Sequence, residues 1–135
     1  MREILFHGKC NEVGKYNGQW IEGFYVEYDG KPFIALSTDH GLIGCFCEPD
    51  SIGQYTGLTD NNGKKIFDGD ILEEIRGNEP YRDVVVANRW NCSCCDGVYG
   101  YAFEHHEERL DFRLIKDYTV VGNIYDNPEL LEAAK

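Results

Sequence analysis

Six cysteines are the residues of this sequence whose type and spacing are best suited to chemistry. They form one close pair, one cluster and one single thiol: Cys45-Phe46-Cys47, Cys92-Ser93-Cys94-Cys95 and Cys10. Zinc takes four thiolate or imidazole ligands in a tetrahedron, and two pairs from separate segments can supply that set. If the chain binds zinc, the predicted ligands are Cys45, Cys47, Cys92 and Cys95. Structural zinc ligands usually have two to four residues between them, and Cys45-x-Cys47 has one, so we favour thiols without metal.

A second group of ligand and acid–base residue types occurs at His105-His106-Glu107-Glu108. Adjacent side chains of a strand point to opposite faces, so the two histidines would share one metal only in a loop. We interpret this segment as a solvated polar loop between two strands. Asp68 and Asp70 are close in sequence, in a spacing that is common in turns. No serine or cysteine lies in a recognisable nucleophile motif, and no glycine-rich phosphate loop occurs. The sequence therefore identifies no enzyme, no catalytic residue and no cofactor.

Charge argues against one broad class of function. The chain of 135 residues has a formal net charge of −11, and residues 66–135 carry fifteen acidic side chains against seven basic ones. Binding to nucleic-acid phosphates depends on cationic side chains that release counterions, so we expect no nucleic-acid binding. No apolar run of about 18 residues is present, so we expect no membrane span. Residues 1–7 lack the apolar segment of a secretory signal, which favours a cytoplasmic protein with reduced thiols.

Turn signals and short apolar runs alternate along the whole chain. Four dipeptides are typical of two-residue hairpin turns: Asn17-Gly18, Asp29-Gly30, Asn62-Gly63 and Asp96-Gly97. The β-prone runs that we predict as strands are residues 4–6, 19–28, 33–36, 42–47, 64–67, 70–75, 82–90, 98–104, 110–115 and 119–125. The pattern predicts a mainly β protein.

The chain changes character at residues 48–57, which we take as the boundary between two halves. Residues 1–48 are predicted as an N-terminal β meander, and residues 49–135 as a small β-roll or barrel with a short C-terminal helix. Pro49 suits the first turn of a short helix, where its missing N–H has no consequence. Asn127 followed by Pro128 is typical of an N-cap and the first helical position.

Three separated blocks resemble the YopX family of phage and prophage proteins. The central block is GQYTGLTDNNGKKIFDGDIL, from Gly53 to Leu72. The opening Phe6-His7-Gly8-Lys9, followed by Asn17-Gly18-x-Trp20-Ile21-x-Gly23, and the end from Val121 to Leu131 match the same family in the same order. The resemblance covers nearly the full length. It implies an SH3-like β-roll for the second half and assembly into homo-oligomers, in the cytoplasm of a bacterial host cell, and it carries no established activity.

The residues that carry this resemblance have a structural interpretation. Motifs that are rich in Gly, Asn and Asp mark turns far more often than functional sites. We therefore predict that these residues fold the chain: Gly53, Gln54, Tyr55, Gly57, Asn62, Gly63, Gly69, Asp70, Gly122, Asn123, Asn127 and Pro128.

The function that these observations favour is a non-catalytic phage accessory protein, an oligomeric interaction module with an unknown protein partner. Large aromatic residues are the candidate interface anchors, namely Trp20, Tyr25, Tyr55 and Trp90, although core positions are favoured for Trp20 and Tyr55. Four alternatives stay open: a small nucleic-acid-binding module, an acidic module that mimics DNA, a zinc-binding protein that uses the cysteine pairs, and a metal-dependent enzyme.

Overall fold

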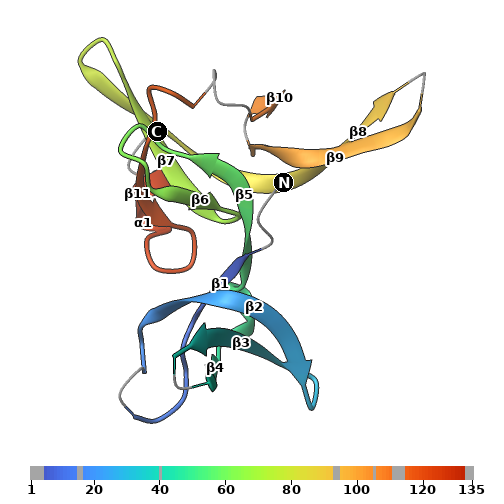
Figure 1. The fold of residues 1–135 in the computed structure, drawn as a ribbon. Helices are drawn as coiled ribbons and strands as arrows, with labels where there is room; N and C mark the ends of the chain where they lie inside the picture. The colour runs from blue at the N-terminus through green and yellow to red at the C-terminus, as the bar shows by residue number, and fades with distance from the viewer. Residues whose placement is uncertain are drawn as a thin grey trace. The chain divides into compact units, whose positions relative to one another are not determined.

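A computed structural model describes residues 5–14, 17–39, 41–92, 95–104, 106–110 and 115–132 (Figure 1). The strands within these ranges are β1 (Phe6–Lys9), β2 (Trp20–Tyr28), β3 (Lys31–Thr38), β4 (Gly41–Phe46), β5 (Gly53–Thr59), β6 (Lys65–Phe67), β7 (Asp70–Arg76), β8 (Glu79–Cys92), β9 (Cys95–Phe103), β10 (His106–Arg109) and β11 (Thr119–Asn123). A 3-10 turn, η1 (Pro49–Ser51), and one α-helix, α1 (Glu129–Glu132), complete the described elements. The predicted mainly β fold with a short C-terminal helix is confirmed.

The chain divides into two compact units, residues Met1–Tyr55 and Thr56–Lys135. The division lies a few residues beyond the predicted change of character at Pro49. The intervening residues belong to the N-terminal unit because the Ser51 hydroxyl accepts a hydrogen bond from the Lys9 N–H at 2.8 Å, and because Gly53 and Gln54 pair with β1. Strand β5 continues into the second unit, where the Thr56 hydroxyl donates to the carbonyl oxygen of Ile66 at 2.9 Å.

The N-terminal unit is an antiparallel meander in which each strand pairs with the next, in the order β4-β3-β2-β1-β5. Strand β2 serves two partners: its first residues pair with β1, and from Phe24 onward it pairs with β3. Gly23 lies at this transition, where a side-chain Cβ would collide with the carbonyl oxygen of Ala35. The absence of a side chain at Gly23 lets β2 curve from one partner strand to the other.

The curved meander has an inner and an outer face, because successive side chains of a strand alternate. The inner face forms the core of this unit, with Cys10, Ile21, Ile34, Cys45 and Cys47 buried and Phe6, Leu36 and Ile52 packed beside them. The outer face carries the other alternate residues, among them Phe24, Val26 and Tyr28 of β2.

The C-terminal unit contains a five-stranded antiparallel sheet in the order β10-β9-β8-β7-β11 (Figure 1). Strands β8 and β9 form its longest hairpin, with register from Val85↔Phe103 to Cys92↔Cys95. Among the described residues, one buried cluster of its core consists of Ile66, Leu72, Val85, Phe103, Leu110, Ile115 and Tyr118. This sheet is compatible with the SH3-like roll, which stays a prediction.

One of the four predicted two-residue hairpin turns, Asp29-Gly30 between β2 and β3, is confirmed. Asp29 and Gly30 have φ angles of 54° and 74°, as such a turn requires. Gly18 and Gly63 also have positive φ angles, of 80° and 82°, but they lie in longer loops that the bonds from Gly18 N–H to Cys10 and from Asp60 N–H to Lys64 close. The prediction of a turn at Asp96-Gly97 is wrong, because both residues lie within β9.

Two further segments differ from the predictions. The polar segment at residues 106–108 belongs to strand β10 and is not the predicted loop, whereas His105 lies outside the described residues. The segment Gly53–Thr59 is strand β5, which the predicted strands did not include because residues 48–57 were taken as the boundary between the two halves. Most of the strand predicted at 110–115 lies outside the described residues.

Candidate binding site

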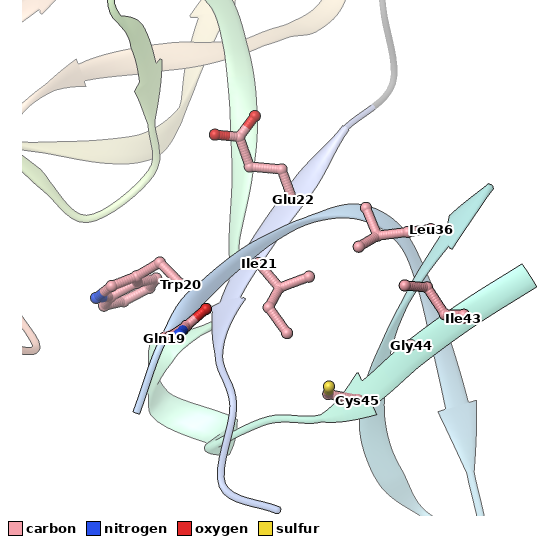
Figure 2. A pocket seen from close by; sticks show the side chains of 8 residues that line it. All are labelled: Gln19, Trp20, Ile21, Glu22, Leu36, Ile43, Gly44 and Cys45. Carbon is pink, nitrogen blue, oxygen red and sulfur yellow. The ribbon is translucent and has the colours of Figure 1, made fainter. Parts of the chain in front are cut away.

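A pocket of about 320 Å³ opens into the core of the N-terminal unit. It is lined by Gln19, Trp20, Ile21, Glu22, Leu36, Ile43, Gly44 and Cys45. Figure 2 shows Ile21, Leu36, Ile43 and Cys45 gathered on one side of the β2 ribbon, while Trp20 and Glu22 are directed away from them. The pocket floor is therefore apolar, and it is the part of the inner face that the meander leaves uncovered.

Ile43 is the inner-face side chain of β4 that the rest of the unit leaves most exposed to solvent. Its neighbours on the inner face, Ile34 and Cys45, are 0% and 5% exposed, whereas Ile43 is 42% exposed. Ile34 lies opposite Cys45, and Leu36 lies opposite Ile43, so all four belong to the same face of the β3–β4 ladder. The core of this unit thus continues into a surface that is open to solvent.

Cys45 lines the pocket, and two further thiols, Cys10 and Cys47, belong to the same buried core. Cys10 and Cys47 form an antiparallel bridge between the end of β1 and the residue after β4, and the Cys47 thiol donates to the carbonyl oxygen of Cys45 at 3.6 Å. All three cysteines are buried and without a disulfide. The sequence predicted Cys45 and Cys47 as a pair, which the structure brings together, but it gave no signal that Cys10 joins them.

Two of these thiols, Cys45 and Cys47, are unsuited to nucleophilic chemistry. Burial, together with a hydrogen bond to Cys10, raises the pKa of Cys45 to about 12, and burial raises the pKa of Cys47 to about 11. Both are therefore protonated at neutral pH. Within the described ranges, no group of three or more His, Cys, Asp or Glu side chains is placed to hold a metal ion.

The second half of the predicted zinc set lies in the other unit. The backbones of Cys92 and Cys95 are paired at the end of the β8–β9 hairpin, while Cys94 and the side chains of Cys92 and Cys95 fall outside the described part of the chain. The zinc site at Cys45, Cys47, Cys92 and Cys95 therefore stays a prediction.

The central motif residues are occupied in folding the second unit, and Asp60 organises them. Its Oδ1 accepts the N–H groups of Asn62 at 2.8 Å and Lys64 at 2.9 Å, and its Oδ2 accepts the N–H of Val120 at 2.9 Å. One carboxylate thus closes the Asn62-Gly63 turn and fastens it to the start of β11. Burial alone would raise the pKa of Asp60, but these three donors hold it below its ordinary value.

Gly69 and Asp70 make the next junction. Gly69 has a φ of 94°, and its N–H donates to the carbonyl oxygen of Val85 while its own carbonyl accepts the N–H of Ile124, both at 2.8 Å. The Asp70 carboxylate accepts the N–H of Phe67 at 2.8 Å. Burial raises the pKa of Asp70 to about 7, and burial also raises the pKa of Asp68. We interpret these acids as parts of a buried turn.

The remaining motif residues also take part in hydrogen bonds, strand pairing or turns that stabilise the fold. Asn127 Oδ1 accepts the N–H of Asn123 at 3.3 Å and lies where a Cβ on Gly122 would intrude. Pro128 accepts the N–H of Leu131 at 3.2 Å in the first turn of the terminal helix. In β5, Gly53 and Gln54 pair with β1, the Tyr55 N–H donates to the Leu5 carbonyl at 2.7 Å, and Gly57 has a φ of 89°.

The outer face of the N-terminal unit is rich in exposed aromatic surface. Phe24 and Tyr28 are 59% and 63% exposed, and Val26 between them is 42% exposed. Tyr28 adjoins the rings of Phe33 and Phe46 at centroid distances of 6.4 and 6.3 Å. An apolar patch of this kind on a small protein is typical of an interaction surface.

The predicted interface anchors are distributed differently. Tyr55 is buried, as the core interpretation expects, and Trp20 is half-buried against the ring of His7 at 4.6 Å. Tyr25 is exposed and adjoins Phe6, and the side chain of Trp90 lies outside the described residues. Sequence inspection missed Phe24 and Tyr28, although their alternation along β2 placed them on one face.

The comparisons with known proteins agree with this architecture. The family model described as YopX protein matches residues 9–132, so the chain belongs to the YopX family. A solved structure, protein EF1440 from Enterococcus faecalis, is similar over 97% of this chain and 99% of that chain, with a TM-score of 0.58 and 20% sequence identity. This likeness concerns the fold alone. No curated protein matches the chain significantly.

Proposed function

We propose that this protein is a non-catalytic phage or prophage accessory protein that assembles into homo-oligomers through the outer face of its N-terminal unit and acts in the cytoplasm of the bacterial host. The observation that carries the proposal is the exposed row Phe24, Val26 and Tyr28 on one face of β2. Family membership supports it. The protonated thiols and the structural use of the motif acids leave the described residues without a catalytic constellation.

The physical argument rests on burial and charge. Fully buried aromatic side chains remove about 150–250 Å² each from water, so covering this row favours association. A chain with a net charge of −11 repels its own copies at long range, so a contact between copies requires a face that is poor in acidic residues. The exposed row of Phe24, Val26 and Tyr28 contains no acidic side chain and would form the apolar centre of the contact, with polar residues around it as the rim.

Sedimentation velocity on matched variants tests the proposal. The double variant Phe24→Ser, Tyr28→Ser should shift the sedimentation coefficient to that of a monomer. Ile75→Ser serves as the control, because Ile75 is also an exposed apolar residue, at 62%, but belongs to the C-terminal unit. The proposal fails if the wild type sediments as a monomer, or if the control variant dissociates as readily as the double variant.

No helix in the described part of the chain is long and apolar enough to cross a membrane. The alternatives of nucleic-acid binding, DNA mimicry and zinc binding rank below self-assembly, because no contact among the described residues favours them.

A further inference from the structure

We propose that the pocket of the N-terminal unit binds an extended, basic peptide segment of a partner protein, which adds as a strand to the outer edge of β4 and places one apolar side chain against Ile21 and Ile43. This inference is independent of self-assembly, because it uses the inner face and the strand edge and not the aromatic outer face. Three observations carry it.

The first observation is the direction of the backbone groups of β4. The Phe46 N–H donates to Glu12 Oε1 and the Phe46 carbonyl accepts the N–H of Asn11, both at 3.1 Å, whereas the Cys47 N–H donates toward β3, to Pro32. Backbone groups of a strand alternate between its two edges. Gly44, two residues before Phe46, therefore turns its N–H and carbonyl to the outer edge, where β4 is the last strand of the sheet.

The second observation is that this edge and the pocket share residues. Ile43, Gly44 and Cys45 line the pocket of about 320 Å³, a volume at the lower end of the range for ligand sites. In recognition by strand addition, main-chain hydrogen bonds give affinity and pockets for alternate side chains give specificity. An apolar side chain from an added strand would cover the exposed part of Ile43 and complete the core.

The third observation is charge. The Glu12 carboxylate lies at the end of this edge, bonded to the Phe46 N–H, and is close enough to contribute to the raised pKa of Cys45. The N-terminal unit as a whole carries four basic against eight acidic residues. A partner strand with lysine or arginine beside its apolar residue is complementary to this field.

Synthetic peptides supply the test. The probe is an acetylated peptide of about seven alternating leucine and lysine residues, which matches a typical strand length. Titration into the ¹⁵N-labelled full chain should shift the amide resonance of Gly44. Replacing leucine by serine in the peptide should weaken binding about tenfold or more, since burying one leucine contributes about 1.5–3 kcal/mol. Replacing lysine by glutamate should abolish binding.

Variants of the protein separate specific binding from attraction of a cationic peptide to an acidic chain. Ile43→Ser should weaken binding about tenfold, and Glu12→Gln should reduce its salt dependence while its amide oxygen still accepts the Phe46 N–H. Ile75→Ser is the control. The double variant at Phe24 and Tyr28 should bind the peptide normally even if it no longer self-assembles. The proposal is overturned if the Gly44 amide does not move, if Ile43→Ser binds as the wild type does, or if the glutamate peptide binds equally well.

Discussion

The ring of Phe33 lies over Gly44 of the neighbouring strand. A Cβ built on Gly44 would stand 2.5 Å from Phe33 Cε1 and 2.5 Å from the carbonyl oxygen of Ile34. The missing side chain thus lets the Phe33 ring settle on the outer face of the β3–β4 ladder, where it meets Phe46 edge-on at a centroid distance of 5.1 Å. Gly44 therefore takes part in two features: it makes room for the Phe33 ring on the outer face, and it lies on the edge strand β4 beside the pocket.

Gly44→Ala should destabilise the N-terminal unit because the added methyl group meets both the backbone and the Phe33 ring. Overpacking of this kind costs about 1–3 kcal/mol. Urea denaturation monitored by tryptophan fluorescence measures the change in the free energy of unfolding. An unchanged midpoint would show that the ring moves aside without penalty.

Asp60→Ala should destabilise the C-terminal unit, because it leaves the N–H groups of Asn62, Lys64 and Val120 without their acceptor. We expect a loss of about 2–4 kcal/mol in the free energy of unfolding. Asp117→Ala is the matched control, since it removes the same charge from an exposed position. Equal losses in the two variants would mean that the Asp60 hydrogen bonds contribute little.

The sequence could predict the class of the fold but only part of these relationships. The turn dipeptide Asp29-Gly30 acts locally, so its position was predicted correctly. The turn predicted at Asp96-Gly97 was wrong, because these residues lie in a strand that is formed by pairing with β8, and a dipeptide pattern contains no information about that pairing. The bond from Asp60 to Val120 joins residues sixty positions apart. The pocket arises where the curved meander leaves Ile43 uncovered, and no local pattern describes that curvature.

Asp70 predicts a pH dependence of stability. Burial raises its pKa from 3.8 to about 7, so the folded chain holds this proton more tightly than the unfolded chain. The contribution of Asp70 to stability is therefore full below about pH 4 and is lost as the pH rises toward 7. Asp70→Asn removes this titration while its amide oxygen still accepts the Phe67 N–H.

We therefore expect the free energy of unfolding of Asp70→Asn, relative to the wild type, to increase between pH 4 and pH 8 by at most about 4 kcal/mol. Asp60→Asn should change in the opposite direction, and only as the pH falls below about 4, because the pKa of Asp60 is lowered in the folded chain from its ordinary value of 3.8. Denaturation at several pH values measures both differences. A difference for Asp70→Asn that stays constant with pH would refute the assignment.

The cysteines predict the outcome of elemental analysis. Because Cys45-x-Cys47 is shorter than the usual spacing of zinc ligands, and because no group of three or more possible ligands is gathered among the described residues, we expect protein purified without chelator to contain far less than one zinc per chain. About one zinc per chain, lost on replacement of Cys92 and Cys95 by serine, would instead establish the site at Cys45, Cys47, Cys92 and Cys95.

Light scattering of the wild-type protein over a wide range of concentrations tests self-assembly most directly. The exposed row of Phe24, Val26 and Tyr28 predicts a mass that is a multiple of the 15.5 kDa chain, and a return to 15.5 kDa when Phe24 and Tyr28 are replaced by serine. A constant mass of 15.5 kDa for the wild type at every concentration would contradict the account.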